Sequence, residues 1–235
     1  MTVRIVDCRP EADYRTGHVP GAVHVDREHD LTGEIDDARR GRHPLPDAER
    51  FAAAAARAGI GADTFVLAYD AGDGWAQRCW WLLRHFGHDR AGTFDVRSYA
   101  GPLETAATLV DAAVFVPHER TDDTIDLDEI RARLDDPRLV LADARSPERW
   151  RGDVEPLDPV AGRIPGARNA FFEEPLPPGL ADAPEIAVYC GSGVTACVPL
   201  QRLILDGRED ARLYPGSFSE WCRHPDMPIE RGDRP

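Results

Sequence analysis

The sequence of 235 residues contains no lysine, so all 28 residues counted as Lys or Arg are arginine. A Schiff-base lysine and the lysine of a P-loop are therefore both excluded. The replacement of lysine by arginine, together with abundant alanine, glycine and aspartate, is typical of a bacterial protein from a GC-rich genome.

Long apolar runs and an excess of positive charge are also missing. No run approaches the ~20 apolar residues of a membrane span, and Met1–Arg4 leads directly into a short apolar segment, so we expect no signal peptide. The net charge of −14 argues against nucleic-acid or membrane partners. Five scattered cysteines argue against a disulfide framework and favour a reducing cytoplasm. We expect a cytoplasmic monomer or weak dimer that acts on a small molecule.

The chain repeats itself, which predicts two related domains. Four segments recur in the same order, at residues 3–9 and 139–145, 17–22 and 162–167, 65–70 and 185–190, and 97–101 and 212–216. Each copy has roughly 100 residues, a common domain size. We therefore predict domains at residues 1–105 and 124–235, joined by a weakly patterned linker at about Leu103–Thr124.

Within each copy, short apolar segments alternate with segments whose apolar residues have helical spacing. Segments 65–69 and 186–189 are too continuously apolar for a sheet with one wet face. This pattern predicts an α/β fold with two tandem domains, each a central, mostly parallel sheet with helices on both faces.

Cys190 is the candidate nucleophile, because it follows the apolar segment 186–189 and precedes a helical segment at 195–205. Ligands bind at the carboxyl ends of strands in such sheets. Gly191 and Gly193 let the intervening backbone turn its N–H groups inward, and the following helix N-terminus adds positive charge. Both features stabilise a thiolate. We expect the sulfur to lie within reach of these amides and of solvent.

These residues carry a family resemblance over nearly the whole chain. The loop Cys190-Gly191-Ser192-Gly193-Val194-Thr195 resembles the active-site loop of tandem rhodanese-like sulfurtransferases, in particular the branch that uses 3-mercaptopyruvate. The resemblance extends to the paired Pro-Gly-Ala motifs, to residues 143–145 and 149–152, and to the terminal segment 214–221.

The resemblance implies roles for individual residues. Cys190 would carry sulfur as a persulfide, and Ser192 would bind substrate or relay a proton. Arg149 would bind the anionic donor, with Arg145 and Arg163 as further candidates. His43 resembles a first-domain histidine that faces the active site, and Glu28 the acidic partner of the serine. Asp70 stands where the second copy has Cys190, so the first domain should be catalytically silent.

The sequence departs from the family at two positions. The branch that uses 3-mercaptopyruvate often has a second arginine nine positions after the first, where this chain has Asp158. Arg163 occupies the position of a usual histidine. The donor, 3-mercaptopyruvate or thiosulfate, therefore stays open.

The expected reaction is transfer of sulfur from a small anionic donor to a thiol, such as thioredoxin or a low-molecular-weight thiol, or to cyanide, without metal or cofactor. A persulfide relay or regulatory module that acts on a protein partner is the alternative. A Cys-x5-Arg phosphatase is disfavoured, because Ala196 stands where the phosphate-binding arginine belongs.

Overall fold

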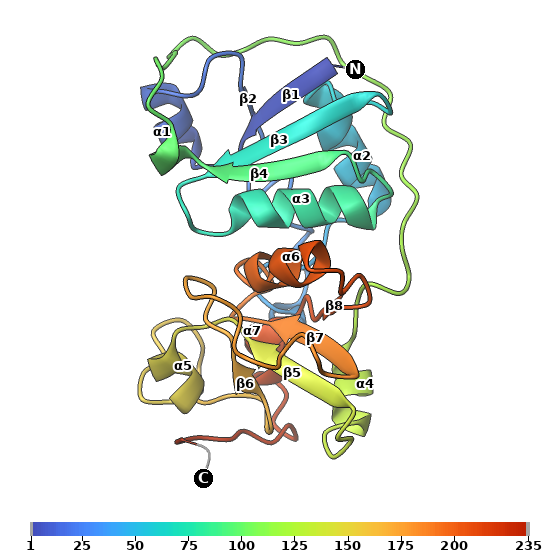
Figure 1. The fold of residues 1–235 in the computed structure, drawn as a ribbon, viewed down its shortest axis with the longest axis vertical. Helices are drawn as coiled ribbons and strands as arrows, with labels where there is room; N and C mark the ends of the chain where they lie inside the picture. The colour runs from blue at the N-terminus through green and yellow to red at the C-terminus, as the bar shows by residue number, and fades with distance from the viewer. Residues whose placement is uncertain (1, 234–235) are drawn as a thin grey trace. The chain divides into compact units, whose positions relative to one another are not determined.

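The computed structural model describes residues 2–233, which form two units (Figure 1). Unit 1 contains the chain up to Glu34 and Leu45–Arg120. Unit 2 contains Ile35–Pro44 and the chain from Thr121 onward. The segment Ile35–Pro44 lies inside the predicted first domain in sequence, yet it packs with the second half of the chain.

Unit 1 is built on a four-stranded parallel sheet in the order β2-β1-β3-β4. Its strands are β1 (Thr2–Asp7), β2 (Val23–His24), β3 (Thr64–Asp70) and β4 (Ala91–Asp95). Its helices are α1 (Glu11–Thr16), α2 (Ala48–Arg57), α3 (Trp75–His85) and the 3-10 turn η2 (Val96–Ser98).

Unit 2 repeats the plan with a parallel sheet in the order β6-β5-β7-β8. Its strands are β5 (Leu139–Asp143), β6 (Arg168–Asn169), β7 (Glu185–Tyr189) and β8 (Arg212–Leu213). Its helices are the 3-10 turn η1 (Ala38–Arg40), α4 (Leu127–Ala132), α5 (Pro147–Arg151), α6 (Cys197–Leu205) and α7 (Ser217–Trp221).

The predicted fold class is therefore confirmed, as two α/β units with parallel sheets of equivalent strand order. The central strands β3 and β7 coincide with the apolar segments expected to be buried, and four of the five residues of β7 are buried. Helix α3 packs on β3 and β4, and α6 packs on β7 and β8. Among residues 2–233, no helix has the length and apolarity needed to cross a membrane.

Candidate active site

Cys190 lies at the carboxyl end of β7, at the start of the loop that leads into α6. Its Sγ accepts hydrogen bonds from the backbone N–H groups of Ser192, at 3.4 Å, and Gly193, at 3.1 Å. Gly193 makes this turn possible with a φ of +77°, a conformation that costs little only for glycine. Val194 and Thr195 then begin the helical turn, because their carbonyls accept from Cys197 N–H and Val198 N–H.

The segment that begins α7 forms hydrogen bonds with the backbone of this loop. The N–H groups of Phe218 and Ser219 donate to the carbonyls of Cys190 and Gly191, at 3.0 and 2.9 Å. The N–H of Cys190 donates to Ser217 Oγ at 3.2 Å. Ser217 is the one non-glycine residue with positive φ, at +55°, in the described part of the chain. Strain of this kind persists where the surroundings over-determine the backbone, and here it supports the cysteine loop.

The structure confirms that backbone amides face the sulfur, but it contradicts the expectation that solvent reaches it. Inward-facing amides do surround it, but Cys190 is only 1% exposed. Ser192 beside it is 8% exposed. The expectation that the sulfur lies within reach of solvent is therefore wrong for this structure.

Unit 1 contains the same cradle with a different atom in it. Asp70 follows β3 as Cys190 follows β7, and its carboxylate accepts from Gly72 N–H at 2.8 Å and from Ala76 N–H at 2.9 Å. Asp70 is 1% exposed. Both loops thus direct amides at an electronegative side chain, but a carboxylate offers no atom that can accept sulfur.

Ser192 and His43 form a side-chain pair within unit 2. The His43 Nδ1 lies 2.8 Å from Ser192 Oγ, although the two residues are 149 positions apart. The segment Ile35–Pro44 places the histidine there, and the turn η1 of this segment contacts α7. The Ser192 hydroxyl, which lies two residues after Cys190 and is hydrogen-bonded to the His43 imidazole, can donate or accept a proton.

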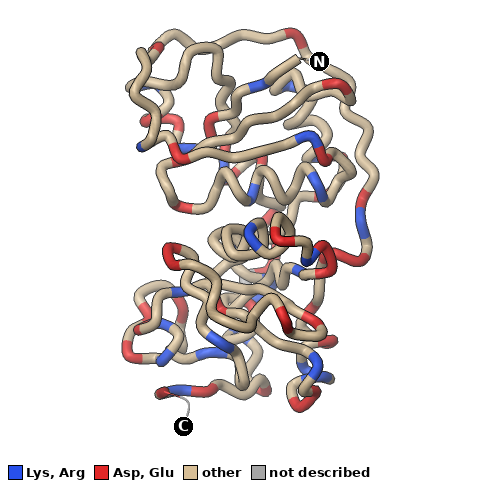
Figure 2. Tube along the Cα trace, viewed as in Figure 1, with Lys and Arg blue, Asp and Glu red and all other residues tan. Residues whose placement is uncertain are grey.

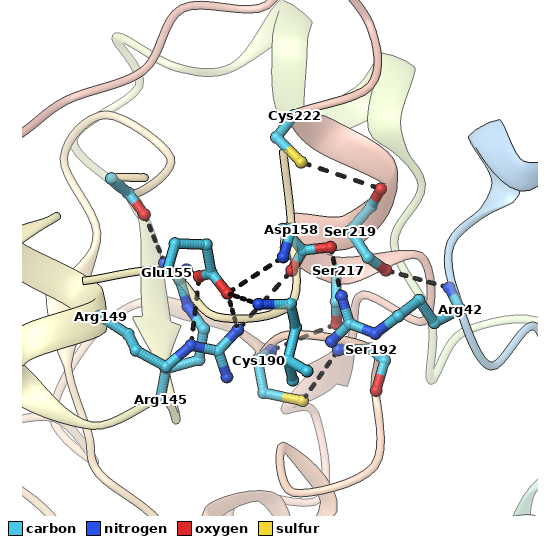
Figure 3. Close-up of polar contacts among 12 residues, drawn as sticks. Arg42, Arg145, Arg149, Glu155, Asp158, Cys190, Ser192, Ser217, Ser219 and Cys222 are labelled. Atoms are coloured by element: carbon cyan, nitrogen blue, oxygen red, sulfur yellow. Dashed lines mark hydrogen bonds and ion pairs between the residues drawn. The ribbon is translucent and has the colours of Figure 1, made fainter. Parts of the chain in front are cut away.

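Arg149 belongs to a group of charged residues beside the cysteine loop (Figure 3). Its guanidinium forms two hydrogen bonds with Glu155, at 2.6 and 3.1 Å, and its Nη2 lies 3.6 Å from Asp158 Oδ2. The Asp158 side chain is fully buried and also pairs with Arg42 and Arg223. Figure 2 shows acidic and basic residues interspersed through both units, so an anion site must come from arginines gathered locally.

The surroundings shift the pKa values of Glu155 and of the nearby Cys222 thiol in opposite directions. Burial opposes ionisation of Glu155, but the hydrogen bond and charge of Arg149 and the N–H groups of Leu157 and Asp158 outweigh it, so the pKa of Glu155 lies below its usual value. Burial, followed by the negative charge of Asp158, raises the pKa of Cys222 to about 11. Cys222 is therefore a neutral thiol at neutral pH.

Arg145 serves the framework of unit 2. It is 2% exposed, forms a bidentate pair with Asp143 and donates to Gly162 O at 2.7 Å. Arg9 in unit 1 forms the same bidentate pair with Asp7 and donates to Gly17 O at the same distance. Because unit 1 contains the same pair and the same carbonyl contact, the Asp-x-Arg motif fastens a strand end to the following loop in both units. In unit 2 the Nη1 of Arg145 also lies 3.2 Å from Glu155.

Arg163 is likewise part of the framework. Its guanidinium lies 4.0 Å from the centre of the Trp150 ring, donates to Trp150 O and pairs with Glu230. At the equivalent position of unit 1, His18 stacks on Tyr14 at 3.9 Å and its Nδ1 contacts Tyr14 O. Arg163 is fully buried, so an arginine here replaces the usual histidine in a packing role.

Glu28 belongs to unit 1, where its carboxylate lies 4.0 Å from Arg27. Its suggested role as a partner of the serine stays a prediction. Sequence reasoning missed Arg42, Glu155 and Arg223 around the loop. The one signal in the sequence that could have revealed them was Asp158, an acid where related enzymes often have an arginine. A carboxylate that is buried at this position requires cations from elsewhere in the chain.

Comparison with known proteins agrees with this geometry. The family model described as Rhodanese-like domain matches residues 1–105 and 126–224. The "Probable 3-mercaptopyruvate sulfurtransferase" of Pseudomonas aeruginosa is 36% identical, over 97% of this chain and 92% of the relative. The human 3-mercaptopyruvate sulfurtransferase is 34% identical, over 92% of this chain and 80% of the relative.

Among solved structures, SseA from Escherichia coli is similar with a TM-score of 0.78 and 26% identity, over 92% of each chain. It is described as having the "Rhodanese" fold of 3-mercaptopyruvate sulfotransferases. The matches of the family model cover most of the chain in two regions, as the internal repeat requires. The chain therefore belongs to the rhodanese family, as a tandem-domain sulfurtransferase.

Proposed function

We propose that this sulfurtransferase takes a sulfur atom from a small anionic donor, 3-mercaptopyruvate or thiosulfate, holds it as the sulfane sulfur of a persulfide on Cys190 and passes it to a thiol or to cyanide. The observation that carries the proposal is the pair of amides, from Ser192 and Gly193, that donate to the cysteine sulfur. Such donors stabilise a negative charge on the sulfur before and after it accepts another sulfur.

The first half-reaction balances with either donor. The Cys190 thiolate attacks the sulfur of 3-mercaptopyruvate, the S–S bond forms and the C–S bond breaks with its electrons going to carbon. The proton of the donor thiol ends on that carbon, giving pyruvate and a persulfide anion. With thiosulfate, attack on the outer sulfur releases sulfite directly.

The second half-reaction regenerates the enzyme. A thiolate attacks the outer sulfur of the protonated persulfide, a new S–S bond forms on the acceptor and Cys190 leaves as thiolate. Cyanide attacks the same atom of the persulfide anion and leaves as thiocyanate. Covalent catalysis in two steps predicts ping-pong kinetics.

Two groups beside the loop complete the mechanism. Ser192, hydrogen-bonded to His43, conveys the proton that the pyruvate carbon requires. Arg149, at 17% side-chain exposure, binds the carboxylate or sulfonate of the donor while Glu155 holds its guanidinium in place.

The acceptor and the cellular setting belong to the same proposal. All five cysteines are free thiols, which suits a reducing cytoplasm. There a small thiol or a thioredoxin-like dithiol is the natural acceptor.

Intact-mass measurement after donor treatment, without acceptor, tests the proposal. The wild-type chain should gain one sulfur atom, which cyanide should remove. Cys190→Ser should gain none and lose turnover, whereas Cys222→Ser, which alters another buried thiol of the same unit, should behave as wild type. Sulfur transfer at the wild-type rate by a folded Cys190→Ser variant would refute the persulfide site, and transfer in a single turnover to a protein alone would make the chain a carrier.

A further inference from the structure

We propose that Arg42 is a second donor-binding residue, which supplies to the active site the positive charge that position 158 does not. This inference rests on the proposed function and assigns to the segment Ile35–Pro44 a role in recognising the donor. The ligand is a small molecule whose carboxylate or sulfonate lies next to its transferable sulfur.

The backbone around Arg42 is fixed on the cysteine loop. Its N–H donates to Ser219 Oγ at 3.1 Å, and Ser219 N–H in turn holds the Gly191 carbonyl. Gly41 precedes it with a φ of +92° and with no room for a side chain, because a Cβ would lie 2.7 Å from Gly216 O. His43 follows it and contacts Ser192. Arg42 therefore starts from a well-defined place beside the nucleophile.

The buried carboxylate of Asp158 orients the side chain of Arg42. The Nη1 of Arg42 bonds to Asp158 Oδ1 (Figure 3). The same oxygen accepts from Arg223 at 3.1 Å. An ionised, fully buried carboxylate is costly unless cations surround it, so Asp158 holds the guanidinium of Arg42 firmly. Position 158, which carries an arginine in many related enzymes, here orients an arginine from elsewhere in the chain.

The other end of the same guanidinium faces the loop. A Cβ on Gly191 would lie 2.8 Å from Arg42 Nη2 and 3.3 Å from Arg149 Nη2. Two guanidinium groups thus flank the residue that follows Cys190. Their side chains are 23% and 17% exposed, so both offer N–H groups to a ligand.

The charge of the group favours an anion. Four arginines (Arg42, Arg145, Arg149 and Arg223) pair with three carboxylates (Asp143, Glu155 and Asp158), which leaves one net positive charge in a chain whose overall charge is −14. A planar guanidinium suits the paired oxygens of a carboxylate or sulfonate.

Alkylation of Cys190 by two reagents measures how much positive charge Arg42 supplies to a molecule that approaches the sulfur. Iodoacetate and iodoacetamide attack the same thiolate and have similar size, but only iodoacetate is anionic. The ratio of their rate constants, measured by mass spectrometry of the peptide that contains Cys190, therefore reports the local charge and cancels any change in thiolate population. It requires no turnover, so it decides the role of Arg42 even if no persulfide forms.

Arg42→Gln should lower this ratio about three- to tenfold, the effect of removing one nearby charge in a partly solvated site. Arg42→Lys should retain most of the ratio. Arg40→Gln, a matched control at an exposed arginine of the same segment, should leave it unchanged. The KM for 3-mercaptopyruvate should rise in Arg42→Gln by a similar factor.

A folded Arg42→Gln variant with the wild-type ratio would overturn the proposal. If that variant does not fold, Arg42→Lys decides, because lysine keeps the charge but lacks the planar pair of N–H groups that binds a carboxylate. The KM for 3-mercaptopyruvate should then rise while the alkylation ratio stays near the wild-type value, and an unchanged KM in folded Arg42→Lys would overturn the proposal.

Discussion

Gly193 offers the sharpest test of how the loop holds its sulfur, through the change Gly193→Ala. A Cβ there would lie 2.5 Å from the carbonyl oxygen of Pro215, a backbone atom that no side-chain rotation can move. The residue has a φ of +77°, which costs alanine about 1–2 kcal/mol. We expect the loop to shift and to carry its N–H away from Cys190.

The size of the effect follows from the lost hydrogen bond. The Gly193 N–H lies 3.1 Å from Cys190 Sγ, and a hydrogen bond to a charged group contributes about 1.5–3 kcal/mol. Because about 1.4 kcal/mol corresponds to a factor of ten, kcat/KM for sulfur transfer should fall roughly 10- to 150-fold.

Gly207→Ala is the matched control. Gly207 has a φ of +92° but nothing within 4 Å of an added Cβ, so alanine there suffers the backbone strain without the contact. Both variants should have a lower Tm, but only Gly193→Ala should lose activity when initial rates are measured well below that temperature. A folded Gly193→Ala enzyme with wild-type kcat/KM would show that this amide does not stabilise the reacting sulfur.

Three further results are expected. Arg149→Ala should raise the KM for the donor at least tenfold, because a charged hydrogen bond contributes about 1.5–3 kcal/mol; an unchanged KM in steady-state assays would remove Arg149 from the site. Asp70→Ala should leave kcat near wild type while lowering the Tm, since Asp70 accepts hydrogen bonds from two N–H groups of unit 1, whereas the proposed site lies in unit 2; complete loss of activity in a folded variant would contradict a silent first unit. The pKa of Glu155 is lowered, so its ionised form stabilises the fold above the ordinary glutamate pKa of about 4.3, and that contribution is lost as pH falls through the lower folded value. Urea unfolding at pH 7 and at acid pH should accordingly show a smaller loss of stability on acidification for Glu155→Gln than for wild type, and equal losses would refute the assignment.

The sequence by itself determined the architecture and pointed to one candidate nucleophile. Continuously apolar segments such as 65–69 and 186–189 can only be central strands of a covered parallel sheet, because either face would otherwise expose apolar side chains to water. The internal repeat then required two copies of one unit, and Cys190 followed the strand at which such sheets place their ligands. These are local patterns, and local patterns can be read without coordinates.

Only the tertiary structure decided which arginines lie beside the cysteine loop. Arg145 and Arg163 have the expected residue type and sequence neighbourhood, but Asp143 and the Trp150 ring hold them inside the framework. Arg42 reaches the loop through a carboxylate 116 residues away, in a segment that joins the second unit from within the first half of the chain. A contact of that separation depends on how loops close in three dimensions, and no periodicity or spacing along the chain encodes it.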